Sequence, residues 1–392
     1  MKRINFVIFF SIVLAVYALI NYYIFIREWE AGGHLASWRG FYVAAFLFLS
    51  LSYIAGRMME RVALTWLSSA LVLLGSFWLA AMVYFLMFAF AIDILRLLNF
   101  FIPFFPSSLT ANPERTKELT SFFVLAVVTI VVFGGYLNAR TPRIKTLNLT
   151  IPKNSRSMKS LNVVVASDIH LGTIVCKSRL EKIVSLMNSL EPDLVLLPGD
   201  VVDEDLGPVI RNNLGETLRK IRSRFGVIAI TGNHEYIGGV EPACRYLSDH
   251  GITMLRDSSL KIADSFYVVG REDLSIRGFA GKSRKPLEEV MSDVDRNYPI
   301  ILMDHQPFRL EEAETHGADL QLSGHTHGGQ VRLPVFGALY AGSLYGKRFE
   351  AGRKQVGGLT LYVTRGIGME GKAAPRMRLL CPPEVIVWEI SH

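Results

Sequence analysis

Long uncharged apolar runs occupy the first third of the chain. The run from Ile4 to Ile26 carries no charge and is long enough to cross a hydrocarbon core of roughly 30 Å. Three further runs of this kind follow, near residues 40–56, 62–92 and 119–139. This pattern predicts an all-α transmembrane region of about four helices over residues 1–143.

The flanks of these runs indicate how the region sits in a membrane. Met1-Lys2-Arg3 resembles the start of a signal peptide, but the following apolar run is too long and no small-residue cleavage site ends it, so we expect a retained anchor. More Lys and Arg residues flank the spans on the side of the membrane where the N-terminus lies. This bias favours a cytoplasmic position for the N-terminus and for the domain that follows the fourth span. The runs themselves contain almost no ionisable residues, which argues against a transporter or channel.

The pattern changes at about Ile144, where short apolar runs rich in Val, Ile and Leu alternate with polar or glycine-containing turns. Continuous apolar runs of this length are typical of strands buried on both faces. They lie at residues 162–166, 193–197, 226–230, 299–303 and 318–322. Between the first two, residues 177–190 have helical spacing of their apolar positions. We therefore expect an α/β domain over residues 144–392.

Polar residues of a restricted kind follow each predicted strand directly. They are Asp168 and His170, then Asp200 and Asp203, then Asn233 and His234, then His305, and finally His325 and His327. In open α/β sheets, binding sites are built just beyond the carboxyl ends of the strands. The five groups are therefore expected to meet in one site.

Composition adds limited information about partners. The net charge is +7, half of the residues are hydrophobic, and the sequence pI is near 9.2. Such a balance suits anionic lipid, nucleic acid or a phosphorylated substrate, but no nucleic-acid recognition motif is present, and we expect no nucleic-acid partner. The three cysteines are scattered without C-x-x-C spacing, so they indicate neither a disulfide framework nor a thiolate zinc site.

The histidines point to a metal site. His325 and His327 are two positions apart, so in an extended backbone both imidazoles face the same side. Five of the nine histidines of the chain fall in the groups that follow the strands. Mixed carboxylate, amide and imidazole ligands suit Mn, Fe or Zn rather than a structural zinc held by thiolates.

The ordered blocks D-x-H, G-D-x-x-D, G-N-H-E, a single His and G-H-x-H resemble those of the calcineurin-like metallophosphoesterase superfamily. The resemblance extends over roughly residues 160–390, and all five blocks are intact. The stretch from Arg365-Gly366-Ile367-Gly368 to Cys381-Pro382-Pro383-Glu384 resembles the membrane-associated bacterial branch. The resemblance implies a four-layer sandwich of two mixed sheets flanked by helices, carrying two divalent metal ions, in a protein of the bacterial inner membrane.

The resemblance also implies a role for each matching residue. The first metal would be held by Asp168, His170 and His327, the second by Asn233, His305 and His325, with Asp200 bridging the two. His234 would protonate the leaving oxygen as a general acid. Asp203 would orient a histidine. A site with two metals can stabilise an in-line displacement at phosphorus.

Three other features carry weaker expectations. Asp304 is expected to orient His305 or to cap a turn. The segment Gly366–Gly371 fits G-x-G-x-x-G, but prolines follow it where a dinucleotide fold needs a helix, so we expect a loop. Eight basic residues between Lys347 and Arg378 are expected to form a solvated face, with some of them receiving substrate phosphates or lipid head groups beside the apolar residues Leu339, Tyr340, Leu344 and Tyr345.

The chain is thus expected to be a membrane-anchored phosphohydrolase with two metals, manganese among the candidates, that cleaves a phosphodiester or pyrophosphate bond. The four spans favour a lipid-linked substrate and contact with membrane lipids. UDP-2,3-diacylglucosamine, cleaved within the resembling group, is the specific candidate. A phosphodiesterase acting on soluble nucleotides is the first alternative, and a non-catalytic metal-binding module is the second.

Overall fold

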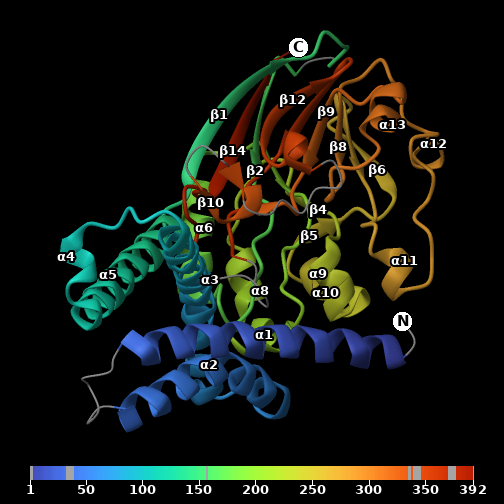
Figure 1. Ribbon diagram of the computed structural model, residues 1–392. Helices are drawn as coiled ribbons and strands as arrows, with labels where there is room; N and C mark the ends of the chain where they lie inside the picture. The colour runs from blue at the N-terminus through green and yellow to red at the C-terminus, as the bar shows by residue number, and fades with distance from the viewer. Residues whose placement is uncertain are drawn as a thin grey trace. The chain divides into compact units, whose positions relative to one another are not determined.

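The computed structural model describes residues 3–31, 39–155, 158–333, 337–338, 346–369 and 377–391. The chain divides into two compact units. The first contains the long N-terminal helices up to Tyr136, and the second contains the sheets and the remaining helices from Leu137 onward. Figure 1 labels the elements of both units.

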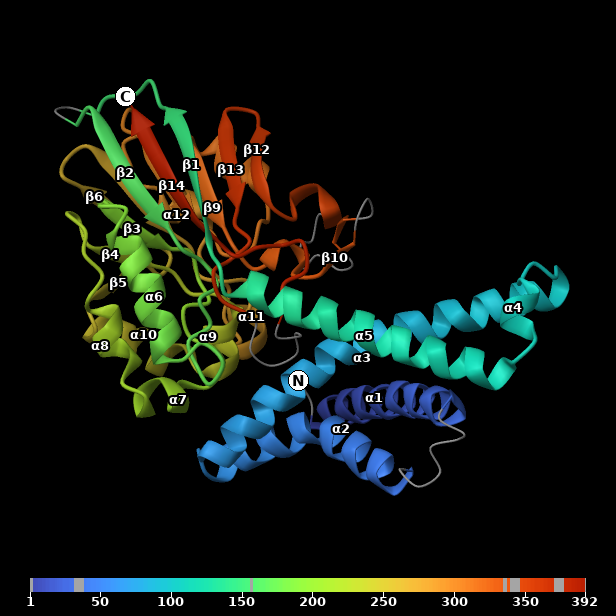
Figure 2. The ribbon, with the colours of Figure 1, turned by 90° about the vertical axis from the view of Figure 1, so that its left-hand side faces the viewer.

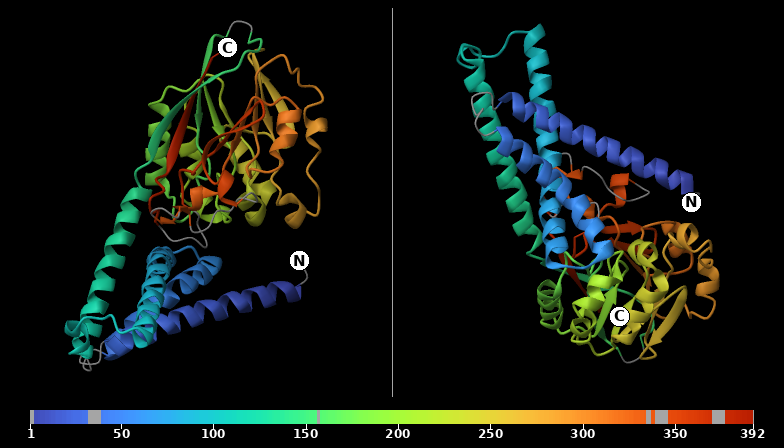
Figure 3. Two further views of the ribbon diagram at one scale, coloured as in Figure 1. Left: turned by 45° about the horizontal axis from the view of Figure 1, so that its top comes forward. Right: turned by 90° about the horizontal axis from the view of Figure 1, so that it is seen from below.

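Four long apolar helices dominate the first unit (Figure 3). Each is long and apolar enough to cross a membrane, and a short fifth helix precedes the last of them. Their bounds are α1 Arg3–Ala31, α2 Arg39–Val62, α3 Trp66–Phe101, α4 Ser107–Thr110 and α5 Pro113–Ala139. All four predicted runs fall largely on these helices, which extend beyond the uncharged stretches into charged residues.

The boundary between the second and third helices differs from the expected one. Val62 ends α2 rather than opening the next span, and α3 begins at Trp66. Thr65 and Ser68 cap α3 reciprocally, because the Thr65 hydroxyl accepts from the Ser68 N–H at 3.1 Å and the Ser68 hydroxyl accepts from the Thr65 N–H at 2.9 Å. This cap fixes the start of the third helix. The absence of charge over residues 62–92, on which the expected boundary was based, does not reveal such a cap.

Small residues allow α2 and α3 to pack closely. A Cβ at Gly75 would overlap the backbone of Tyr53, and one at Gly56 would lie 2.7 Å from the Val72 nitrogen. Charged residues that the sequence placed outside the spans also contact each other inside this unit, with Arg27 2.6 Å from Asp93. Asp93 also lies 3.9 Å from Arg96, one helical turn further along α3.

Two six-stranded mixed sheets form the centre of the second unit. The first sheet has the order β1 (Arg143–Thr150), β14 (Glu384–Ser391), β2 (Ser160–Val165), β3 (Leu194–Leu197), β4 (Val227–Ala229) and β5 (Ile252–Met254). The second has the order β12 (Gly352–Val356), β13 (Leu359–Val363), β9 (Leu320–Ser323), β8 (Ile300–Met303), β7 (Phe266–Gly270) and β6 (Ser258–Ile262). The first sheet is parallel except between β14 and β2, and the second has antiparallel pairs at both edges.

Helices cover the outer faces of both sheets. In Figure 2, α6 lies over the first sheet. The helices of the second unit are α6 Lys177–Asn188, α7 Leu206–Arg211, α8 Leu214–Leu218, α9 Asn233–Gly238, α10 Val240–Asp249, α11 Ile276–Phe279, α12 Leu287–Val290 and α13 Leu310–Thr315. Two 3-10 turns, η2 His327–Gly329 and η3 Gly346–Phe349, and a small hairpin of β10 Arg332–Leu333 with β11 Gly337–Ala338 complete it.

The two sheets pack face to face around one core. Val163 and Val165 of β2 contact side chains such as Ile301 of the opposite sheet, whereas Val164 points the other way, into the core beneath α6. Successive strand residues face opposite sides, so each strand contributes to two cores, and each buried Val or Ile stabilises the fold by about 1.5–3 kcal/mol. The four-layer sandwich and its doubly buried strands are therefore confirmed.

Candidate metal centre

The expected site residues all follow the carboxyl ends of strands, either in the loops there or at the start of the next helical turn, as with Asn233 and His234 in α9 and His327 in η2. Loops after β2, β3 and β4 come from the first sheet, and loops after β8 and β9 come from the second. The groups that the sequence distributes over 160 residues are thus brought together where the two sheets end side by side (Figure 1). This is the edge at which parallel strands of an α/β sheet position ligand-binding side chains.

The backbone at these positions is strained. Five expected ligands have left-handed φ angles that residues other than glycine rarely adopt, namely Asp168 (53°), His170 (51°), Asp200 (51°), His325 (68°) and His327 (48°). Such conformations cost of order 1–3 kcal/mol each and concentrate at functional sites. These backbone conformations lower the stability of the fold, and they direct the ligand side chains toward the site.

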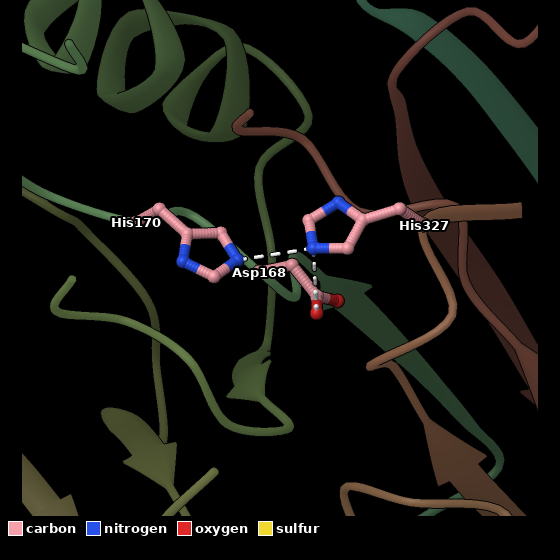
Figure 4. A group of neighbouring side chains, drawn as sticks. All are labelled: Asp168, His170 and His327. Carbon is pink, nitrogen blue, oxygen red and sulfur yellow. Dashed lines mark hydrogen bonds and ion pairs between the residues drawn. The ribbon is translucent and has the colours of Figure 1, made fainter. Parts of the chain in front are cut away.

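Asp168, His170 and His327 form the first group (Figure 4). The Nε2 atoms of the two histidines are 3.1 Å apart, and His327 Nε2 lies 3.6 Å from Asp168 Oδ1. All three residues are buried. Two ring nitrogens and a carboxylate oxygen therefore converge on one point from two segments, the loop after β2 and the turn after β9.

Asp200, His305 and His325 form the second group, and Asn233 lies among them. His305 Nε2 is 3.1 Å from Asp200 Oδ2 and 3.2 Å from the Asn233 side-chain oxygen. That same Asn233 oxygen is 2.7 Å from His325 Nδ1. Because Asp200 Oδ2 also lies 3.8 Å from His170 Nε2, Asp200 stands between the two groups.

Asp203 and His234 adjoin the first group. His234 Nδ1 lies 3.0 Å from Asp203 Oδ1, and its ring stands edge-on to that of His170 with centroids 4.5 Å apart. The His234 backbone N–H donates to Asp200 Oδ1 at 2.9 Å. The structure therefore brings every expected site residue into one cluster.

The charges in the cluster perturb one another strongly. Burial acts to raise the pKa of Asp200, but the neighbouring His305 and His234 outweigh it and hold that pKa well below its ordinary value. Burial also acts to raise the pKa of Asp203, but the neighbouring imidazoles of His170 and His234 outweigh it and hold that pKa below its ordinary value. Burial and the charge of His305 lower the pKa of His325, so that this ring favours its neutral, ligating form.

The donor set suits divalent cations. Asp168 and Asp200 are buried, and in the described part of the chain neither carboxylate forms an ion pair with lysine or arginine. A buried carboxylate without a compensating cation is costly, and ring nitrogens that face one another need a Lewis acid or a shared proton between them. Two metal ions placed in the two groups would satisfy both requirements.

Some contacts of the site were not predicted from the sequence. Glu235 accepts backbone N–H bonds from Asp200 at 3.1 Å, Val202 at 2.9 Å and Gly232 at 2.8 Å, and thereby ties two ligand loops together. Its place at the third position of a helix that follows Gly232 is a capping-box signal that could have revealed it. Burial and the charge of Asp200 raise the pKa of Glu235 to about 7.

Other expectations need correction. Asp304 neither orients His305 nor caps a turn, because its two oxygens accept from Arg284 Nη1 at 3.0 and 2.9 Å. Arg378 is fully buried rather than part of a solvated basic face, whereas Lys347, Arg348, Arg353 and Lys354 are exposed as expected. Leu339, Tyr340, Leu344, Tyr345 and the last two residues of Gly366–Gly371 lie outside the described residues.

Comparisons with known proteins agree with this geometry. The family model of the calcineurin-like phosphoesterases matches residues 161–329. A transmembrane protein with a metallophosphoesterase domain from Danio rerio is 30% identical over 75% of this chain and 68% of its own length. An uncharacterised metallophosphoesterase of Campylobacter jejuni is 28% identical over 98% of this chain and 99% of its own.

A dimetal phosphatase from Danio rerio is among the similar solved structures, with a TM-score of 0.34, 13% identity, and coverage of 54% of this chain and 88% of that one. The family model and the relatives carry the assignment, and relatives occur in both bacteria and eukaryotes. The chain therefore belongs to the calcineurin-like metallophosphoesterase family, as a membrane protein whose second unit is a metal-dependent phosphoester hydrolase.

Proposed function

We propose that this protein is a membrane-anchored phosphohydrolase that cleaves a phosphodiester or pyrophosphate bond in a lipid-linked substrate. The proposal assigns residues 1–143 to the bacterial inner membrane and residues 144–392 to a catalytic domain on its cytoplasmic side. One observation carries the chemistry: two clusters of imidazole and carboxylate groups lie on either side of Asp200, and the pair of His234 and Asp203 adjoins them.

In this proposal Asp168, His170 and His327 hold one ion, and Asn233, His305 and His325 hold the other, with Asp200 between them. The ions would supply Lewis-acid chemistry at the phosphoryl group when bound. Manganese, iron and zinc all suit the ligand set.

His234 is the proposed general acid. Its Nδ1 is engaged by Asp203, which fixes the ring and stabilises its protonated form. We assign to its other nitrogen the transfer of a proton to the leaving oxygen. Asp203 acts as a positioning residue through this contact.

An apolar cavity in the first unit supports the lipid-linked substrate. It has a volume of about 350 Å³ and lies among α1, α2, α3 and α5. Aromatic side chains such as Trp29, Tyr42 and Trp78 line it, and Glu28 and Ser121 add polar groups. A cavity with an apolar body and a few polar groups matches a hydrocarbon chain that carries a polar head.

The chemistry is tested on the detergent-purified, Mn-loaded full chain, incubated with UDP-2,3-diacylglucosamine and analysed by mass spectrometry. Formation of UMP and a lipid monophosphate by the wild type and the His316→Ala control, but not by His234→Ala, is the expected result. Cleavage of bis(p-nitrophenyl) phosphate or a soluble nucleotide while the lipid survives would replace the substrate with a soluble one. Absence of any cleavage with each metal would favour a binding module.

The cavity is tested separately with Ala45→Trp. Ala45 lines the cavity, whereas Ala44 on the same helix is exposed and provides the matched control Ala44→Trp. Filling the cavity should raise KM for the lipid substrate and leave hydrolysis of bis(p-nitrophenyl) phosphate unchanged. Equal lipid kinetics in the two variants would remove the cavity from the account.

A further inference from the structure

The strongest unexplained feature beside the site is a buried cation, Arg378. It follows the region matched by the family model, and its side chain is fully buried. In the described part of the chain it forms no ion pair with a carboxylate; it donates to two backbone carbonyls and a histidine ring, and it also interacts with the Cys381 side chain. Burying a guanidinium in this way is costly, so its position calls for a compensating role.

The contacts of the guanidinium form a fork. Nη1 donates to the Arg365 carbonyl at 2.6 Å, and Nε and Nη2 donate to the Gly368 carbonyl at 3.1 and 2.8 Å. Nη2 also lies 3.1 Å from Nδ1 of His327. Because a guanidinium has donors only, the ring nitrogen accepts in this contact.

The two nitrogens of His327 therefore face different groups. Nε2 points toward Asp168 and His170, and the other nitrogen points away from them, as Figure 4 shows. Arg378 holds that second nitrogen and so fixes the plane of the ring. Partners of the outer ring nitrogen are what orient a ligating histidine.

Arg378 also reaches the opposite side of the first group. The Gly368 N–H donates to the Asp168 carbonyl at 2.8 Å, and the neighbouring Ile367 N–H donates to the Ser167 carbonyl at 2.9 Å. The carbonyl of that same Gly368 accepts two bonds from Arg378. One side chain thus links His327 and the Asp168 loop, which are 159 positions apart in the chain.

From this geometry we infer that Arg378 is a positioning residue for one metal only, the ion held by Asp168, His170 and His327. The inference rests on the ligand assignment of the proposed function. No contact of Arg378 reaches Asn233, His305 or His325, so the second ion should not depend on it.

Arg378→Lys separates geometry from electrostatics, because it keeps the charge and removes the planar fork. Binding of Mn²⁺ to the full chain in detergent is measured by equilibrium dialysis and metal analysis. Wild type and the exposed control Arg353→Lys should bind two ions. Arg378→Lys should bind one ion as before and the other about 10–100-fold more weakly. If the melting temperature shows that Arg378→Lys does not fold, Arg378→Gln, which buries no charge, replaces it. The same weakening of one Mn²⁺ site is expected for this variant.

Two outcomes contradict the inference: unchanged affinity for both ions, or equal weakening of both. His327→Ala distinguishes this failure from failure of the ligand assignment. If His327→Ala loses one ion and Arg378→Lys loses none, only the role of Arg378 is wrong. If His327→Ala keeps both ions, the ligand assignment itself is wrong.

Discussion

The Nδ1 atom of His234 lies 3.0 Å from Oδ1 of Asp203, and both side chains are buried beside the first metal group. This contact directs Nδ1 to a carboxylate, and the proposed proton transfer is assigned to the other ring nitrogen of His234. It connects the loop after β3 with the start of α9 and fixes the orientation of His234, the general acid of the proposed function.

Asp203→Asn should preserve the shape of this contact and remove its charge. We expect kcat to fall about 10–100-fold with little change in KM. The alkaline limb of the pH–rate profile should move to lower pH, because the protonated ring loses its negative neighbour. Asp205→Asn, at the exposed N-cap of α7 two residues further along the same loop, should behave as wild type. An unchanged pH profile in Asp203→Asn would contradict the positioning role.

Gly324 should tolerate no side chain. A Cβ at this position would overlap Ser167 Oγ and the Asp168 carboxylate, which are held by their own loop. Gly324→Ala is therefore expected to destabilise the protein by about 1–3 kcal/mol and to weaken metal binding. Gly278→Ala, where a Cβ has open space, is the control. Denaturant unfolding of both variants measures the difference, and equal stabilities would show that the Asp168 loop can move aside.

Arg284 should be required to compensate Asp304. The side chains of Arg284 and Asp304 are 11% and 4% exposed, and both carboxylate oxygens of Asp304 accept from Nη1 of Arg284. Removing one partner of a buried pair costs about 3–5 kcal/mol, so Arg284→Met should be strongly destabilised and the double variant with Asp304→Asn less so. The exposed pair of Lys285 and Glu289 is the control. Lys285→Met should lower the free energy of unfolding by less than about 1 kcal/mol. A double variant as unstable as Arg284→Met would contradict this pairing.

Glu235 should make the stability of the metal-free protein depend on pH. Its pKa rises from 4.5 in the unfolded chain to about 7 in the fold, so the folded state retains a proton that the unfolded state releases. The stabilisation is complete below pH 4.5 and is lost as pH rises toward 7. In EDTA, the melting temperature of the wild type relative to Glu235→Gln should be higher at pH 5 than at pH 7. The exposed control Glu289→Gln should show no such change, and a difference that grows with pH would refute the sign.

The strands that carry the site could be predicted because they are buried on both faces. Runs such as residues 162–166 and 299–303 are continuously apolar, and they correspond to β2 and β8. In contrast, β1 was not predicted, because it is largely exposed and pairs with β14, a partner more than 200 residues away. Local patterns carry no information about such pairings.

The site residues could be predicted from the sequence for a different reason. Asp168, Asn233 and His325 sit in short blocks whose order and spacing resemble a known family, and the fold brings these blocks together. The contacts of Arg378 and Arg284 depend on how distant loops close against each other. No periodicity or motif encodes them, so they appear only in the structure.

The central claim is that the two side-chain groups bind two metal ions that share Asp200. The most direct test is the metal content of the full-length protein, purified in detergent, stripped with chelator and reloaded with Mn²⁺. Wild type should hold two ions per chain, and Asp200→Ala should hold fewer than one, because both groups lose a ligand. A wild type that binds no Mn²⁺, Fe²⁺ or Zn²⁺, or an Asp200→Ala protein that still holds two ions, would contradict the account.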